Sequence, residues 1–110
     1  MPPSARNINN TLTGEIITLV CEAWGVTRPE LVSRSRKQPL PWARSQLCHY
    51  LRLYAGHDCV SCAAMLNISD ISVLHYNYRY TRLLHRYTPF RDRDDQISSQ
   101  IKALIHSPEP

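Results

Sequence analysis

The stretch Cys59–Tyr87, CVSCAAMLNISDISVLHYNYRYTRLLHRY, decides the predicted fold. Its first eight residues are predicted to form a short helix, and Asn67-Ile68 is predicted to form a turn. Ser69 then caps a long helix that runs to about Tyr87, where Thr88-Pro89 stops it. The stretch therefore predicts two consecutive helices joined by a tight turn.

Three residues within this stretch are typical of a helix-turn-helix, in which two helices cross steeply. Ala63 is small enough to allow close packing, and Asn67 tolerates the left-handed backbone that the turn needs. Val73, early in the second helix, is expected to fill the gap between the helices. The pattern is short and degenerate, so the second helix has to supply independent support.

The second helix has two distinct faces. Its inner face is predicted to carry Val73, Asn77, Tyr80, Leu84 and Tyr87. Another face carries, at steps of three and four residues, Ser72, His75, Arg79, Arg82 and Arg86. Short polar groups followed by arginines suit a helix in the major groove, where the first residues meet base edges and the later ones meet phosphates. A solvated charged face is the alternative interpretation, and the tyrosines of this helix are interpreted as packing residues.

Outside this stretch, the chain is also predicted to be helical. Apolar residues recur at helical spacing over three further segments, about 13–24, 41–54 and 94–106. The capping box Thr27-Arg28-Pro29-Glu30 predicts a short helix, and a polar basic loop follows at 33–39. We therefore expect an all-α fold of five to six helices that contains a helix-turn-helix.

The composition fits one globular domain. The chain has 110 residues, of which 43% are hydrophobic, enough to bury a helical core. We expect a flexible tail at 1–11, a single helical domain at 12–106 and a second tail at 107–110. No apolar run approaches the roughly 18 residues of a membrane helix, and the first residues lack the features of a signal peptide. A cytoplasmic protein without membrane contact is expected.

Basic residues are concentrated in the middle of the chain. Between Arg28 and Arg93 there are eleven basic and four acidic residues, a net charge of +7, against +4 for the whole chain. Eleven of the thirteen basic residues are arginine, whose forked guanidinium suits contacts with phosphate and guanine. This distribution favours a polyanionic partner, although an ordinary solvated surface would also explain it.

Cysteine and histidine do not form a recognisable reactive site. Cys59-x-x-Cys62, with His57 and Cys48 nearby, could be part of a zinc site, but a second pair of ligands at finger-like spacing is missing. The histidines are scattered, and no nucleophile or carboxylate stands beside them in a catalytic pattern. We expect no metal, no cofactor, no catalytic residue and no enzymatic activity.

The whole pattern resembles the C-terminal, origin-box-binding domain of the bacterial chromosomal replication initiator, DnaA. The similarity spans roughly Glu15 to Leu104. It rests on the succession Ile16-Ile17-x-x-Val20, Trp24-Gly25-Val26, Glu30-Leu31, Ser33-Arg34-Ser35-Arg36, Ala43-Arg44, Tyr50-Leu51 and Val73-Leu74-His75. The resemblance implies a Trp-repressor-like helical fold in a stand-alone protein of the bacterial nucleoid. No phosphate-binding loop motif occurs in the chain, so we do not expect it to contain the ATPase portion of the family.

The resemblance also implies roles for individual residues. In that family, the basic loop sends an arginine into the minor groove, and Arg36 matches this position. An arginine at the start of the next helix contacts DNA, and Arg44 matches it. The residues expected to contact phosphates are Arg34, Lys37, Arg44, Arg79, Arg82 and Arg86. The residues expected to face bases are Asp70, Ile71, Ser72 and His75.

The recognition helix departs from the signature of that family, Gly-Arg-Asp-His-Thr-Thr-Val. Counting back from Val73, Ser72 and Ile71 replace the two threonines, Asp70 stands at the histidine position, and the arginine is absent. These changes weaken the expectation that the chain binds the usual box of the initiator. The phosphate contacts lie elsewhere and are expected to remain.

We expect the protein to bind double-stranded DNA, with full or partial sequence specificity, as a monomeric regulator of replication or transcription. Its expected partners are double-stranded DNA and, beyond it, the replication initiator or its sites. The alternative is a protein-interaction module that keeps the fold but has lost DNA-box readout.

Overall fold

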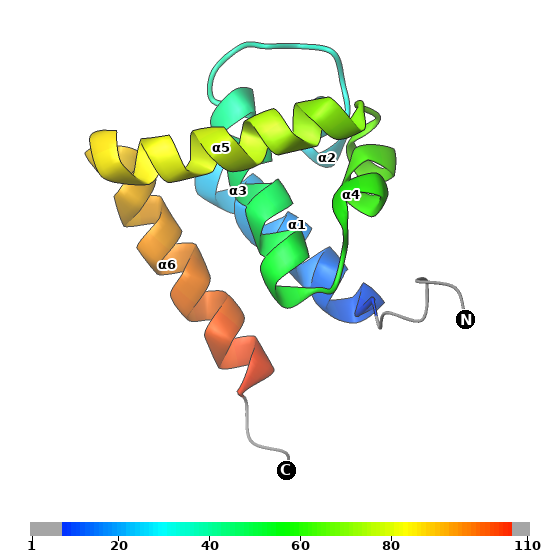
Figure 1. The fold of residues 1–110 in the computed structure, drawn as a ribbon. Coiled ribbons are helices and arrows are strands. Elements are labelled where there is room, and N and C mark those ends of the chain that lie inside the picture. The colour runs from blue at the N-terminus through cyan, green and yellow to red at the C-terminus, as the bar shows by residue number, and fades with distance from the viewer. Residues whose placement is uncertain (1–7, 107–110) are drawn as a thin grey trace.

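The computed structural model describes residues 8–106, and within them it contains six helices and no strand (Figure 1). The helices are α1 (Asn10–Trp24), α2 (Arg28–Leu31), α3 (Leu40–Tyr54), α4 (Cys59–Leu66), α5 (Asp70–Arg86) and α6 (Thr88–Ile105). The predicted all-α fold class is therefore confirmed. Residues 1–7 of the first predicted tail and the whole second tail, 107–110, lie outside the described residues.

Helix α3 is the centre of the core. It packs against α1, α2, α4 and α5, while α6 packs against α5 and α1. Leu47, Cys48, Tyr50 and Leu51 of α3 are enclosed, as the predicted helical stripe requires. Helix α5 lies across α3 and leaves its other side toward solvent (Figure 1).

The turn between α4 and α5 has the geometry that the sequence predicts. The two helices are bent by 100° relative to one another across the break. Asn67 ends α4 in the left-handed region, at φ 58° and ψ 46°, and the Ser69 side chain accepts from the backbone N–H of Ser72 to begin α5. Ala63 and Val73 are both buried where the helices meet. Asn67 therefore has the left-handed backbone that the sequence predicts, and Ala63 and Val73 are enclosed.

Two helices begin earlier than predicted. The Asn9 side chain accepts from Leu12 N–H, so α1 begins at Asn10, and residues 10–11 belong to the helix rather than to the tail. Helix α6 begins at Thr88 instead of about Asp94, because Pro89 lies in its first turn, where the missing N–H costs nothing.

Within the described part of the chain, no single helix is long and apolar enough to cross a membrane. Helices α4 and α5 meet the criteria of length and composition only when they are taken together as a bent pair.

Candidate nucleic-acid interface

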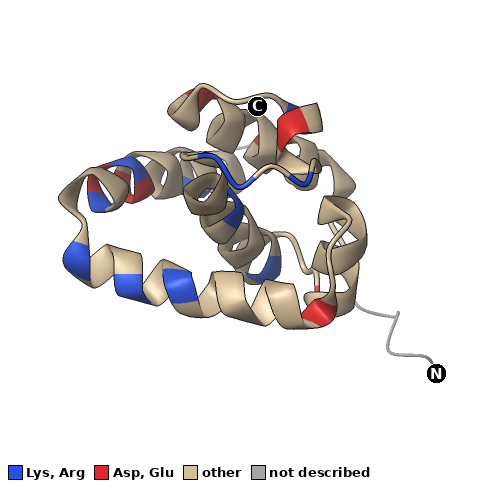
Figure 2. Cartoon of the chain, turned by 90° about the horizontal axis from the view of Figure 1, so that it is seen from above, with Lys and Arg blue, Asp and Glu red and all other residues tan. Residues whose placement is uncertain are grey.

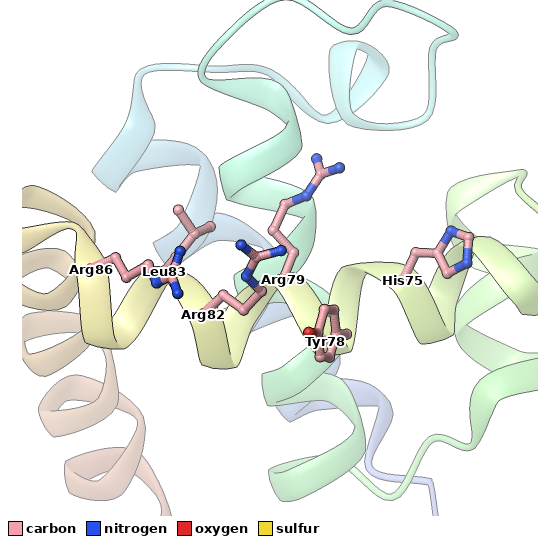
Figure 3. A pocket seen from close by; sticks show the side chains of 6 residues that line it. All are labelled: His75, Tyr78, Arg79, Arg82, Leu83 and Arg86. Atoms are coloured by element: carbon pink, nitrogen blue, oxygen red, sulfur yellow. The ribbon is translucent and has the colours of Figure 1, made fainter.

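Helix α5 is buried on one side only. Val73 and Tyr80 face the core, while His75 and the three arginines Arg79, Arg82 and Arg86 are exposed. These exposed side chains line one hollow of about 420 Å³ together with Tyr78 and Leu83 (Figure 3). The predicted polar and basic face of this helix is therefore open to solvent.

The start of α5 presents a mixed surface. Asp70 and Ile71 are exposed, and Ser72 is half-buried beside the capping hydroxyl of Ser69, at 3.0 Å between the two Oγ atoms. Ile71 and Tyr78 are 64% and 66% exposed, although the tyrosines of this helix were expected to pack. Exposed apolar and aromatic side chains therefore lie among the polar ones in the first half of α5.

A second hollow joins α5 to the loop that connects α2 and α3. It measures about 370 Å³, and its lining residues are Arg36, Gln38, Pro41, Ser72, His75, Tyr76 and Arg79. Arg36 therefore lies beside Ser72 and Arg79, although more than thirty residues separate them in sequence. Since His75 and Arg79 line both hollows, the two form one continuous surface, which we call the basic groove.

The basic groove is positively charged. Lys and Arg occur on both the loop and the outer side of α5 (Figure 2), and no acidic residue lines either hollow among the residues described. Arg79 and Arg82 lie over the rings of Tyr76 and Tyr78, at 5.8 and 5.7 Å from the ring centroids. These cation–π contacts restrain the long side chains while leaving their guanidinium groups available.

The other predicted site residues lie near this groove but do not line it. Arg34 and Lys37 are exposed on the same loop, and Asp70 and Ile71 are exposed at the N-terminal end of α5. The structure therefore brings Arg36, Ser72, His75, Arg79, Arg82 and Arg86 together along one surface.

Arg44 does not lie on this surface, which corrects the expectation that it contacts phosphate. Its side chain is only 3% exposed, and four of its N–H donors reach backbone carbonyls. A guanidinium enclosed in this way has no path to a DNA backbone. The sequence does indicate that Arg44 is buried, because this residue falls on the apolar stripe of α3 between Leu40 and Leu47.

Two cysteines and one histidine of the described region are buried, namely Cys48, Cys62 and His57. Burial raises the pKa of the Cys62 thiol to about 11 and raises that of Cys48 further. His57 lies between Thr13 Oγ1 at 2.8 Å and Ser61 Oγ at 2.5 Å. Within residues 8–106, no group of three His, Cys, Asp or Glu side chains is arranged to hold a metal ion.

Comparison of the chain with protein-family models, with curated proteins and with solved structures gave no match.

Proposed function

We propose that this chain binds double-stranded DNA through the basic groove, with α5 in the major groove. The observation that carries the proposal is the meeting of Arg36 with Ser72, His75 and Arg79 around one hollow. A helix end with short polar side chains beside a cationic loop offers base contacts and backbone contacts at adjacent places on a duplex.

The two ends of the basic groove have different proposed roles in binding DNA. From Ser72 to Arg86 the helix advances about 21 Å, so its start can enter the groove while its later arginines reach phosphates. Asp70, Ile71, Ser72 and His75 are the proposed base-facing residues. Arg79, Arg82 and Arg86, with Arg34 and Lys37 of the loop, are the proposed phosphate contacts, and Arg36 is the proposed minor-groove contact.

The biological role that we propose is regulation of replication or transcription by a monomer. The resemblance to the DNA-binding domain of the replication initiator supports this role. It rests on the succession of short motifs from α1 to α5, and the all-α fold is compatible with it.

Fluorescence anisotropy tests the proposal with two labelled duplexes, one bearing the origin box of the initiator and one scrambled. Both are titrated across a salt series with the wild-type chain, with R36A/R79A and with R52A. Arg52 is the matched control, because it is exposed on α3 and lines a different hollow, beside Asp58. We expect R36A/R79A to weaken binding at least tenfold and R52A to have little effect.

The two duplexes separate specific from general binding. Tighter binding to the box that persists as salt rises means that specific readout is retained. Equal binding with a steep salt dependence means that the cognate site is a different sequence. No binding to either duplex at low salt contradicts the proposal.

A second candidate function is protein interaction, which the apolar side chains of α5 favour. Ile71, Leu74 and Tyr78 are each more than half exposed and follow one another at steps of three and four residues. If this function is the correct one, replacing Arg36 and Arg79 leaves the biological activity unchanged, whereas replacing Ile71 and Tyr78 abolishes it.

A further inference from the structure

We infer that Arg44 is a positioning residue that holds the 33–39 loop in the conformation that places Arg36 beside α5. This inference rests on the proposed function and assigns Arg44 a role without any contact to DNA. Its guanidinium connects the central helix of the core to the loop.

The hydrogen bonds of Arg44 reach both ends of the segment before Arg36. Its Nε donates to Leu31 O at 2.8 Å and its Nη1 to Ser35 O at 2.7 Å, while Nη2 donates to Glu30 O and Ser33 O at 3.1 and 2.9 Å. The carbonyls of Ser33 and Ser35 flank Arg34, and Ser35 directly precedes Arg36. The backbone on which both arginines stand is therefore fixed from within the core.

The loop has little else to hold it. Arg34, Arg36, Lys37 and Gln38 are exposed. The other hydrogen bonds of the loop are local ones, made by Ser33 and Ser35 and by Leu40 N–H, which donates to Lys37 O. A polar loop without buried apolar side chains has no packing to offset the conformational entropy lost on ordering. The buried guanidinium supplies the missing long-range contacts.

Arginine is specifically suited to this position. The planar guanidinium has five N–H donors in fixed directions, and four of them are used here on four separate carbonyls. The ammonium group of lysine has three donors on a single atom and cannot reach four carbonyls that are spread around the guanidinium. Arg44→Lys therefore keeps the charge but is expected to release part of the loop.

The test is a double-mutant cycle in DNA binding between Arg44→Lys and Arg36→Ala. In the wild-type background we expect R36A to weaken binding about tenfold or more, and in the R44K background less than threefold. R82A is the matched control, because Arg82 stands on α5, and it should weaken binding equally in both backgrounds. Equal losses for R36A in both backgrounds overturn the inference.

Hydrogen exchange of the free protein gives a readout that does not depend on DNA. R44K should accelerate exchange of the loop amides while the amides of α3 and α5 stay protected, and unchanged loop exchange contradicts the inference. If the wild-type chain binds no DNA, the proposed function fails, and the exchange result alone decides whether Arg44 fixes the loop. If R44K does not fold, S33G/S35G loosens the loop with Arg44 intact and should reduce the effect of R36A in the same way.

Discussion

The buried side chain of Asp94 in α6 connects α6 to two other helices by hydrogen bonds. Its Oδ1 accepts hydrogen bonds from the hydroxyl groups of Tyr50 in α3 and Tyr80 in α5, the latter at 2.7 Å. Burial and the hydrogen bond to Asp94 raise the pKa of both tyrosines, so both hydroxyls keep the protons that they donate. Asp94 lies inside α6 and is 7% exposed.

Replacing Asp94 should be costly, because two buried hydroxyl groups lose their acceptor. Each unsatisfied buried donor costs about 1–3 kcal/mol, so we expect Asp94→Ala to lower the free energy of unfolding by about 3 kcal/mol. Urea denaturation at pH 7 measures this. Asp95→Ala is the matched control, because it removes the same charge from an exposed neighbour. Similar losses for both variants would contradict the role given to Asp94.

His49 should make stability depend on pH. Its ring stacks on Tyr80 at 3.8 Å between centroids, and burial lowers its pKa, with Arg52 adding to the effect and Asp94 opposing it. The unfolded chain therefore takes up protons more readily than the folded chain. The contribution of His49 to the free energy of unfolding is fully present above pH 6.5, the ordinary histidine pKa, and is lost as the pH falls below that value. Burial lowers the pKa of His57 as well, so both histidines contribute in the same direction.

His49→Phe keeps an aromatic ring on Tyr80 and removes the titrating group. We expect the loss of unfolding free energy between pH 7.5 and pH 5.5 to be smaller in this variant than in the wild type. The exposed His85 supplies the control, His85→Phe, which should leave the loss unchanged. A wild-type chain equally stable at both pH values would refute the prediction.

At the scale of elements, the turn between α4 and α5 depends on the backbone of Asn67. Its φ of 58° lies in the region that glycine and asparagine adopt most easily. Because the side chain is exposed, substitution changes the backbone preference and little packing. We expect Asn67→Ala to destabilise the fold by about 1 kcal/mol and Asn67→Gly to be close to neutral, as measured by thermal unfolding. Equal losses for alanine and glycine would show that the side chain itself matters.

Helix boundaries and apolar stripes were predictable where local signals agree. The span of α4 and α5 follows from a left-handed asparagine, a capping serine and the spacing of apolar residues. The predicted start of α6 is wrong. Pro89 was interpreted only as the end of the preceding helix, whereas a proline is equally suited to the first turn of a helix.

Two charged residues are buried because each lies on the apolar stripe of its helix. Asp94 lies between Phe90 and Ile97 on the buried stripe of α6, as Arg44 does on that of α3. Spacing alone places both side chains inside. Their partners, a pair of tyrosine hydroxyls and four loop carbonyls, are set by tertiary contacts that no local pattern contains. The nearness of the basic loop to α5 is likewise set by tertiary contacts, and no local pattern predicts it.

At the scale of the whole molecule, the basic groove makes a quantitative prediction about salt. Five exposed cations are the proposed phosphate contacts, namely Arg34, Lys37, Arg79, Arg82 and Arg86. Each phosphate neutralised on B-form DNA releases counterions and contributes about −0.9 to the slope of log K against log salt concentration. If all five engage, the slope is about −4.5.

Removing cations from α5 should change this slope in proportion. The triple variant R79A/R82A/R86A is expected to make the slope shallower by about 2.7, because three phosphate contacts are lost. R52A removes a positive charge outside the groove and lowers the net charge without changing a contact, so it should leave the slope unchanged. Anisotropy titrations between 50 and 200 mM salt, roughly the range over which such contacts dominate affinity, measure both slopes. If the triple variant and R52A gave the same slope, the three arginines of α5 would not neutralise phosphates, and α5 would not be the DNA-contacting element.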